Sequence, residues 1–307
     1  MLSYGYTVRA IISADHVICS NALRYERGIR MFKIVVLLKQ TFDTEEKIHI
    51  ENGVVNEDGA KFIINPYDEY ALEEALRIKE QHDAEIIVIS VGPERSTHAL
   101  RSALAVGADH AILIADHTYL NQSSSIAHLL AAAIRPMNVD LILAGLFAVD
   151  SGSGSVALQV AELLQLPHAS AAIKLRLGDA LELNVEAAPW EGKLALVERD
   201  VEGDTETVLL PLPALITAQQ GLNDPRYPSL PGIMKAKKKP LTELFSSDLL
   251  LADVIENIST SATYCEQVLP PAARPAGQFI TGTAQQQAST LLEQLFARSI
   301  IKKGGEC

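Results

Sequence analysis

Cysteine and aromatic residues are scarce in this sequence, and both shortages narrow the class of protein. Only three cysteines occur in 307 residues, Cys19, Cys265 and Cys307, and they lie far apart. This spacing excludes a disulfide framework and a cysteine metal site. Aromatic residues make up 5% of the chain, whereas 48% of the residues are hydrophobic, chiefly Ala, Leu, Val and Ile. That balance favours strands buried between helices over an all-β sandwich.

Long apolar runs and an excess of positive charge are also missing. The longest apolar runs have the length of a strand and fall far short of a membrane span. The formal net charge is -12, which argues against a general role in binding nucleic acid or an anionic membrane. We therefore expect a protein of the cytoplasm. The short basic run at residues 235–239 is interpreted as a solvated surface or as a contact with an acidic partner.

Residues 1–30 differ from the rest of the chain. They show no helical or strand period that continues beyond them. Asp15 and Glu26 weaken the interpretation as a transit peptide, and the apolar stretch of a signal peptide is absent. We predict a poorly ordered extension, with the working protein beginning at Met31.

From Met31 onward, strand-like and helix-like segments alternate. Continuous apolar runs predict strands covered on both faces, and apolar residues at helical spacing follow each of them. Alternation at this spacing is typical of βαβ crossovers, so we predict a doubly wound, mostly parallel α/β sheet. The predicted strands are 32–39, 85–91, 111–114 and 140–145, and the predicted helices begin at 65–66 or cover 99–107, 123–134 and 155–165.

The character of the chain changes after His168. Residues 168–217 are expected to form strands joined by short turns, which adds an antiparallel region. Residues 241–282 contain several prolines and are expected to form an extended arm, followed by an amphipathic helix at 283–302. An arm of this kind more often wraps a partner than closes its own core. We accordingly divide the chain into an extension (1–30), a nucleotide-binding α/β domain (31–240) and an arm with a terminal helix (241–307).

The loop at residues 145–156 is the strongest candidate for a binding site, because it joins a buried strand to the start of a helix. Main-chain N–H groups and the helix dipole favour a phosphate at such a place. Glycines let the backbone approach a ligand, and serines can donate hydrogen bonds. Asp150 would repel a phosphate, so it is expected to bond a ribose hydroxyl or to cap the helix. On this loop alone, a flexible connection whose serines merely cap the helix is an equally good interpretation.

Other strand ends are expected to meet beside this loop. In a doubly wound sheet, the carboxyl ends of neighbouring strands converge on one crevice. Residues 37–40 and 90–92 end predicted strands. Asn65 suits a helix N-cap, Pro66 suits the first turn, and Asp68 stands where a capping-box acid would. This convergence favours a nucleotide site more than any one loop does.

Catalytic motifs are hard to find. The histidines lack metal-binding spacing, and neither a G-x-S-x-G elbow nor a G-x-x-x-x-G-K-[ST] loop occurs. We therefore predict no catalytic residue and no metal ligand, with Glu73 and Glu74 on a solvated helix face. Gly152, Gly154 and Ala157 match the pattern G-x-G-x-x-A, but they do not follow the strand directly, as the dinucleotide fold requires. An NAD-linked oxidoreductase is the runner-up hypothesis, and a nucleotide-sensing binding module is a third.

Several motifs resemble those of one family. The chain reads V-E-R-D-V-E-G-D-T-E-T-V at 197–208, P-A-L-I-T at 213–217, and L-N-D-P-R-Y followed by L-P-G-I-M-K-A-K-K-K within 222–239. The runs V-L-L-K-Q at 36–40 and I-N-P-Y-D-E at 64–69 match as well. Over about residues 31–302 the sequence resembles the β subunit of electron transfer flavoprotein.

The resemblance implies a fold like that of the adenine nucleotide alpha hydrolases and a heterodimer with a larger α subunit that binds most of a redox FAD. It implies an electron carrier, which passes electrons from acyl-CoA dehydrogenase-type flavoproteins to the respiratory chain in fatty acid oxidation. This chain would hold AMP, or a second FAD if it resembles the electron-bifurcating members. By similarity, the nucleotide contacts are Leu37, Asn65, Pro66, Tyr67, Asp68, Val91, Gly145, Asp150, Gly152, Ser153, Gly154, Ser155 and Val156.

The resemblance also implies a docking segment at residues 226–235, with Leu230 as an apolar anchor for the dehydrogenase. An apolar anchor with a basic rim suits a brief encounter. The closing arm and helix resemble the segment that wraps the α subunit. One departure is G-L-F-A-V-D at 145–150, where the family has G-[KR]-Q-A-I-D, so a cation near the phosphates is missing. The predicted docking residues are Arg226, Tyr227, Leu230, Pro231, Met234 and Lys235.

Overall fold

The computed structural model describes residues 31–51, 53–115, 122–185, 190–249, 268–270, 272, 274 and 276–301. These residues fall into two compact units. One unit is formed by residues 31–48 and 56–249, and the other by residues 49–55 and the described residues from 268 to 301. The extension predicted at residues 1–30 lies outside the described residues.

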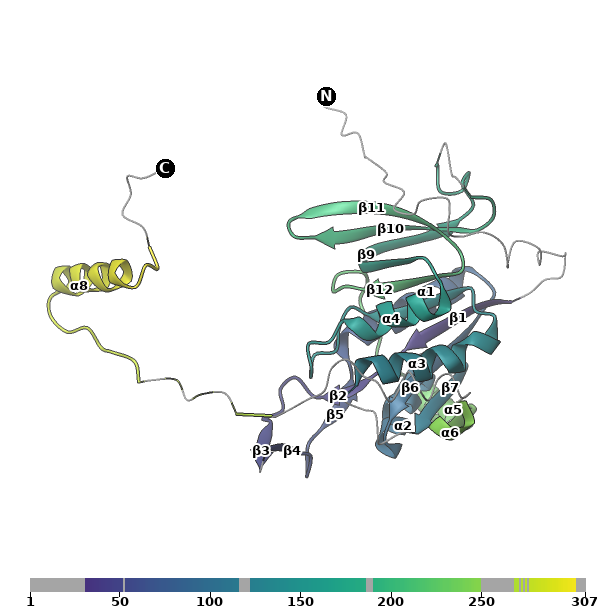
Figure 1. Ribbon diagram of the computed structural model, residues 1–307, viewed down its shortest axis with the longest axis horizontal. Helices are drawn as coiled ribbons and strands as arrows, with labels where there is room; N and C mark the ends of the chain where they lie inside the picture. The colour runs from purple at the N-terminus through teal and green to yellow at the C-terminus, as the bar shows by residue number, and fades with distance from the viewer. Residues whose placement is uncertain are drawn as a thin grey trace. The chain divides into compact units, whose positions relative to one another are not determined.

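A nine-stranded sheet forms the centre of the first unit (Figure 1). Its strands are β1 (Phe32–Leu37), β6 (Ala84–Gly92), β7 (His110–Ala115), β8 (Leu141–Gly145), β9 (His168–Gly178), β10 (Leu194–Val201), β11 (Asp204–Pro211), β12 (Ala214–Ala218) and β13 (Leu241–Phe245). They are ordered β11-β10-β9-β12-β8-β1-β6-β7-β13. All neighbours from β9 to β13 in this order pair in parallel, and β10 runs antiparallel to both β9 and β11. The predicted α/β class with a mostly parallel sheet and an antiparallel addition is confirmed.

Helices cover both faces of this sheet. They are α1 (Pro66–Gln81), α2 (Thr97–Val106), α3 (Ser123–Ile134) and α4 (Ser155–Leu164), with short 3₁₀ turns η1 (Glu94–Ser96) and η2 (Arg135–Met137). Buried residues of α1 and α2 share one core cluster with the sheet, and those of α3 and α4 share another. The two clusters identify two opposite faces, as expected for a sheet wound in both directions.

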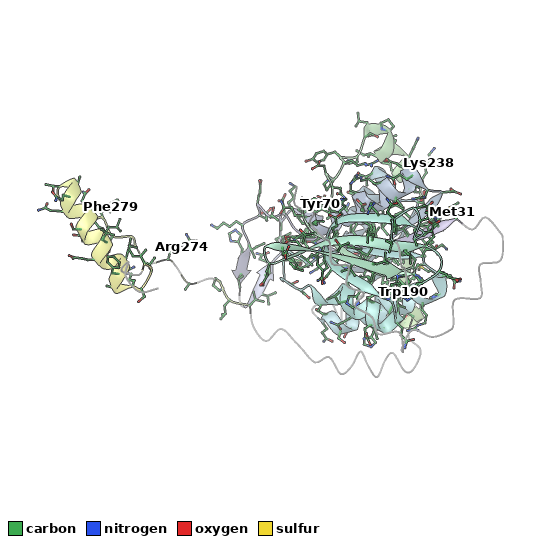
Figure 2. All side chains as sticks on the ribbon, turned by 90° about the horizontal axis from the view of Figure 1, so that it is seen from above. Met31, Tyr70, Trp190, Lys238, Arg274 and Phe279 are labelled. Carbon is green, nitrogen blue, oxygen red and sulfur yellow. The ribbon has the colours of Figure 1, made fainter. Side chains whose placement is uncertain are left out.

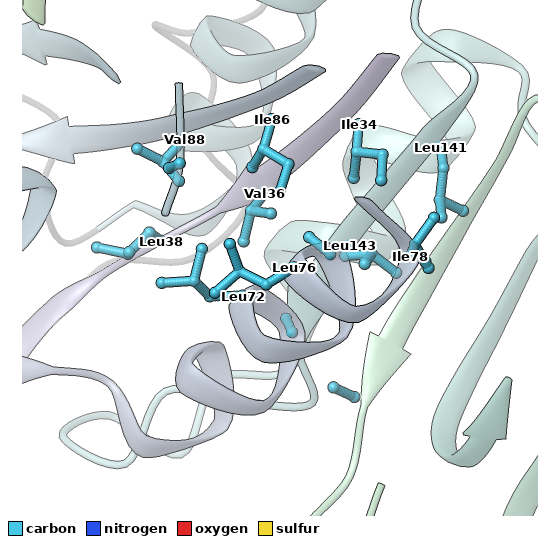
Figure 3. Packing of buried hydrophobic residues seen from close by; sticks show 14 of the residues in the cluster. Ile34, Val36, Leu38, Leu72, Leu76, Ile78, Ile86, Val88, Leu141 and Leu143 are labelled. Carbon is cyan, nitrogen blue, oxygen red and sulfur yellow. The ribbon is translucent and has the colours of Figure 1, made fainter. Parts of the chain in front are cut away.

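The core on the α1 face consists of aliphatic side chains, namely Leu, Ile, Val and Ala. Figure 3 shows Leu72 and Leu76 of α1 lying over Val36 of β1, Val88 of β6 and Leu143 of β8. All five side chains are buried. Burial of one such side chain stabilises the fold by about 1.5–3 kcal/mol, so α1 is firmly fixed on the central strands.

Two elements of the first unit were not predicted from the sequence. Residues 241–245 form β13, which pairs in parallel with β7, so placing the start of the arm at residue 241 was wrong. Residues 230–236 form a short helix, α5 (Leu230–Ala236), whose first turn contains Pro231 and whose N-cap Ser229 accepts a hydrogen bond from the main-chain N–H of Gly232. A four-residue helix, α6 (Ser246–Leu249), follows β13.

Two short strand pairs lie within residues 40–64. In the first unit, β2 (Gln40–Phe42) pairs antiparallel with β5 (Phe62–Ile64). The second unit contains the pair of β3 (His49–Glu51) and β4 (Val54–Asn56), and the helix α8 (Ala284–Ala297). Thr283 and Gln286 form a capping box at the start of α8, and the side chain of Phe279, labelled in Figure 2, is 97% exposed. None of the helices in the described part of the chain is long and apolar enough to cross a membrane.

Candidate functional site

The carboxylate of Asp68 joins two strand ends to the start of α1. Its Oδ2 accepts a hydrogen bond from the main-chain N–H of Lys39, after β1, at 2.7 Å. Its Oδ1 accepts from the main-chain N–H of Gly145, at the end of β8, and from the Asn65 side-chain amide, both at 3.0 Å. Burial raises the pKa of Asp68 to about 7, although the N–H donors favour the charged form. Asp68 therefore holds this edge together from inside.

Only glycine fits at position 145, because the start of α1 lies close to the end of β8. A Cβ at this position would overlap the Asp68 Oδ1 and lie 2.7 Å from the carbonyl carbon of Tyr67. We expected the glycines of this loop to admit a ligand, but Gly145 admits a neighbouring helix. Gly152 has a different role, since its φ of +65° is left-handed and a Cβ there would meet nothing within 4 Å.

Asn65 ties the loop after β8 to the start of α1. Its side-chain amide donates to the carbonyl of Phe147 at 3.0 Å, and its Oδ1 accepts from the main-chain N–H of Val149 at 3.1 Å. The rings of Tyr67 and Phe147 lie 4.3 Å apart between centroids. Asn65 occupies the N-cap position of α1, as the sequence predicted, but its side chain makes no capping hydrogen bond. The side-chain amide of Asn65 is bonded instead to the loop after β8.

A cation does lie beside this loop, although the sequence of the loop lacks one. Lys39 Nζ, which comes from the end of β1, is 2.6 Å from Asp150 Oδ1. The sequence interpretation gave Asp150 a helix cap or a ribose hydroxyl as partner, whereas the structure pairs it with Lys39. Both side chains are partly exposed, so the ion pair itself stabilises the loop by at most about 1 kcal/mol.

Serine hydroxyls connect the starts of two helices. Ser123 at the start of α3 lies 3.1 Å from Ser153 between hydroxyl oxygens, and Ser153 lies 3.4 Å from Ser155 at the start of α4. Among the described side chains, none caps either helix. This finding argues against the interpretation of the serines as simple caps. Sequence reasoning missed Ser123, although a serine at a predicted helix start was a usable signal.

The ends of β1 and β6 complete this edge. The main-chain N–H of Leu38 donates to the carbonyl of Ile89 at 2.9 Å, and Leu37 is buried beside them. Val91 is half-buried at the end of β6. The Ser90 hydroxyl is buried and finds no partner among the residues that the structure describes, an unusual state that an added ligand or water would relieve.

The structure thus brings together the strand ends and loops that the sequence placed in one crevice. Two helix starts without a side-chain cap, serine hydroxyls and the Lys39 cation fit a phosphorylated ligand. The side chains of Asn65 and Asp68 are already bonded within the protein, so their part is to hold the edge in place. Direct contact between these residues and a nucleotide remains a prediction.

The predicted docking residues divide into two groups. Tyr227, Leu230 and Met234 are 94%, 80% and 65% exposed, and Pro231 and Lys235 are exposed as well. In contrast, the guanidinium of Arg226 points back to α1, where it bonds the carboxylate of Glu73. The expectation that Glu73 and Glu74 lie on a solvated face was wrong, since each is only 6% exposed.

A cavity of about 240 Å³ lies between α1, α2 and residues 225–228. Its walls include Tyr70, Glu73 and Tyr227, so it adjoins the docking segment and not the phosphate-binding loop. Within the described residues, no group of three or more histidine, cysteine, aspartate or glutamate side chains is placed to hold a metal ion.

Comparison with known proteins identifies the family of this chain. Residues 52–249 match the family model described as "Electron transfer flavoprotein domain". The chain is 47% identical over 264 residues to "Electron transfer flavoprotein subunit beta" of Bacillus subtilis, covering 85% of this chain and 96% of that protein. It is 36% identical over 225 residues to the bovine protein of that name, covering 71% and 82%. It is also 35% identical over 274 residues to "Caffeyl-CoA reductase-Etf complex subunit CarD" of Acetobacterium woodii, covering 88% and 100%.

Proposed function

Because this chain belongs to the electron transfer flavoprotein family as a beta subunit, an electron carrier and not an enzyme, we propose that it binds an adenine nucleotide and pairs with an alpha subunit around a shared FAD. The flavin supplies the reversible uptake and release of electrons. The heterodimer would pass electrons from acyl-CoA dehydrogenase-type flavoproteins toward the respiratory chain in the cytoplasmic compartment.

The observation that carries the proposal is the joining of two uncapped helix starts by the hydroxyls of Ser123, Ser153 and Ser155. Hydroxyl donors and two positive helix ends at one place suit a phosphate group. Lys39 adds a positive charge at the same loop. When a phosphate binds, Lys39 can turn from Asp150 to the ligand, which would replace the cation that the loop itself lacks.

The nucleotide is AMP in the first form of the proposal and a second FAD in the alternative form. The alternative is favoured by one relative, whose name places it in a caffeyl-CoA reductase-Etf complex and which matches this chain over its full length. In both forms the adenosine phosphate occupies the same edge of the sheet, so the two differ in what extends beyond the phosphate.

The docking surface of the proposal consists of Tyr227, Leu230 and Met234, which are exposed on and before α5. Pro231 shapes the first turn of that helix and Lys235 supplies a positive rim. Exposed large apolar side chains grouped on a short helix are typical of a protein interface.

The test is to co-express the chain with its alpha subunit, purify the complex, release its nucleotides with acid and identify them by mass. We expect a yellow heterodimer that contains one FAD with AMP, or two FAD. A stable monomer that transfers hydride from NADH to a small substrate would instead support the oxidoreductase hypothesis. A monomer that is stabilised by adenine nucleotides without any redox partner would support the sensing module.

A further inference from the structure

Arg226 makes a forked contact with α1 at the point where the docking segment begins. Its Nε and one terminal nitrogen donate to the two oxygens of Glu73, each at 2.8 Å, and its main-chain N–H donates to Glu73 at 3.1 Å. The other terminal nitrogen lies 2.5 Å from Glu80 Oε1. Two parallel N–H···O bonds fix direction as well as distance, so this contact orients the chain that follows.

Asn223 adds a second attachment to the same helix. Its side-chain amide donates to the carbonyl of Tyr70 and to Glu74 Oε2, both at 3.0 Å. Burial raises the pKa of Glu74, and the Asn223 hydrogen bond opposes that shift. The start of the segment is therefore bonded to two successive buried carboxyl groups of α1.

The end of the segment is bonded to α2. Arg101 donates to the carbonyls of Ala236 and Lys239, at 2.7 and 2.8 Å. Lys239 Nζ in turn donates to the carbonyls of Leu104 and Ala108, at 3.0 and 2.6 Å. These bonds satisfy carbonyls at the ends of α5 and α2, which leaves little freedom at this end.

Between the two attachments, the middle of α5 lies directly on α2. A Cβ at Gly232 would overlap the carbonyl oxygen of Ala105, so only glycine permits this approach. The opposite side of the same segment presents Tyr227, Leu230 and Met234 to solvent. Figure 2 labels Tyr70, whose carbonyl accepts the Asn223 amide at the α1 attachment.

We propose that Arg226 is a positioning residue, which latches the docking segment to α1 through Glu73 and Glu80 and so presents Leu230 and its neighbours in a fixed arrangement. This inference rests on the proposed function and replaces the expectation that Arg226 touches the dehydrogenase. A segment ordered before the encounter loses less conformational entropy on docking. The latch therefore acts on the strength of docking and leaves electron transfer within a formed complex unchanged.

The experiment uses the purified heterodimer with Arg226→Ala, Arg226→Lys and Leu230→Ala, and with Arg77→Ala as the matched control. Arg77 is an exposed arginine of α1 that makes one contact of 3.4 Å with Glu74. Two quantities are measured: amide hydrogen exchange over residues 223–236, and the rate at which an acyl-CoA dehydrogenase reduces the heterodimer. Nucleotide and flavin contents are measured alongside.

We expect Arg226→Ala to speed exchange over residues 223–236 by about tenfold or more and to raise the KM for the heterodimer by about tenfold, which corresponds to roughly 1.4 kcal/mol. Its kcat and its nucleotide content should stay at wild-type values. Arg226→Lys keeps the charge without the fork and should recover part of both effects. Arg77→Ala should behave like the wild type.

Three results would overturn the latch. The first is an unchanged rate of amide exchange over residues 223–236 in Arg226→Ala, whatever happens to the KM. Arg226 would then act by direct contact with the dehydrogenase or not at all. The second is an altered kcat with a constant KM. A full recovery of both quantities by Arg226→Lys would show that charge alone matters. If Arg226→Ala fails to assemble, Glu80→Ala removes one bond of the latch and must give the same changes at smaller size.

Failure of the underlying function is recognised separately. If Leu230→Ala reduces neither the rate nor the affinity, the docking assignment is wrong, while the exchange data still decide whether Arg226 orders the segment. If Leu230→Ala weakens docking and Arg226→Ala does not, the docking assignment stands and the latch is refuted.

Discussion

Asp68 is the residue on which the shape of the candidate site depends most directly. Its carboxylate accepts N–H donors from the ends of two neighbouring strands and from Asn65, and it is fully enclosed between them. Asparagine has nearly the same shape but can accept on one atom only. Its NH₂ group would therefore face a main-chain N–H that needs an acceptor.

At pH 5 the raised pKa keeps a proton on Asp68, so Asp68→Asn should change the free energy of unfolding by less than about 1 kcal/mol, because the acid and the amide each carry hydrogen on one terminal atom. The raised pKa of Asp68, about 7, means that the folded chain keeps a proton that the unfolded chain releases above about pH 4. The free energy of unfolding of the wild type therefore falls as the pH rises from about 4 to about 7. Because asparagine does not titrate, the wild type should lose stability relative to the variant as the pH rises toward 8.

Urea unfolding of the heterodimer between pH 5 and pH 8 checks this prediction. The exposed Asp58→Asn variant is the control and should run parallel to the wild type. A gap between Asp68→Asn and wild type that stays constant over the whole pH range would show that Asp68 does not titrate as argued.

Gly145→Ala tests the closeness of the loop to α1. The added methyl group would overlap Asp68 and the main chain of Tyr67, neither of which is a flexible side-chain end. We expect a loss of stability of about 2–3 kcal/mol, in the range of an overpacked core, together with reduced nucleotide content. Gly277→Ala, where a Cβ meets nothing within 4 Å, should be neutral in the same thermal melts.

At the scale of elements, the site depends on α3 and α4 beginning at the same place. Each helix brings a serine and its first turn to the edge of the sheet, and Ser153 bridges the two serines. Two helix N-termini supply partial positive charge for a phosphate, so a lysine within the loop itself is not required. Under the proposed function, the two helix ends take the place of the cation of the family motif.

Ser123→Ala should weaken retention of the nucleotide by about five- to tenfold, the equivalent of one hydrogen bond of about 1 kcal/mol. The neighbouring Ser124→Ala, on the same helix, is the matched control. Equilibrium dialysis of nucleotide-depleted heterodimer against labelled AMP measures both variants. Equal affinities for the two variants would show that α3 takes no part in the site.

The regular elements could be predicted from the sequence, because their patterns are local. The strand at 32–37 and the helices from Pro66, Ser123 and Ser155 follow from apolar periodicity and punctuation by glycine and proline. The convergence of loops followed from the rule for parallel sheets. The helix α5 was missed because Pro231 and Gly232 disfavour a helix, and its stability comes from Ser229 and from packing on α2.

Side-chain partners that lie far apart in the chain could not be predicted. Asn65 and Glu73 are acceptable as a helix cap and a surface acid when only their neighbours are considered. Their true partners, Phe147 and Arg226, are separated from them by 82 and 153 residues. No local pattern connects such residues, and β13 was missed for the same reason, since its partner β7 lies more than a hundred residues earlier.

The molecule as a whole is acidic, whereas the proposed docking segment and the residues after it are basic. The net charge is -12, yet Lys235, Lys237 and Lys238 are exposed on and after α5. A local patch of opposite sign steers a partner to one face and away from the rest. The orientation of the encounter is therefore expected to depend on ionic strength.

Raising the salt from about 0.02 M to about 0.2 M should slow association with an acyl-CoA dehydrogenase severalfold, because the Debye length shortens. The double variant Lys237→Ala, Lys238→Ala should associate more slowly at low salt and show a weaker salt dependence. Stopped-flow reduction of the heterodimer measures both. A salt slope identical to that of the wild type would exclude these lysines from steering.

The position of β12 has a consequence for biosynthesis. This strand enters the sheet between β8 and β9, although both are made before it. While the ribosome is still short of residue 214, β8 and β9 each have a bare edge, and the antiparallel meander of β9, β10 and β11 cannot attach to the central strands. Newly made chains thus pass through a stage with two open edges, where chaperones or the arriving alpha subunit would find unpaired backbone.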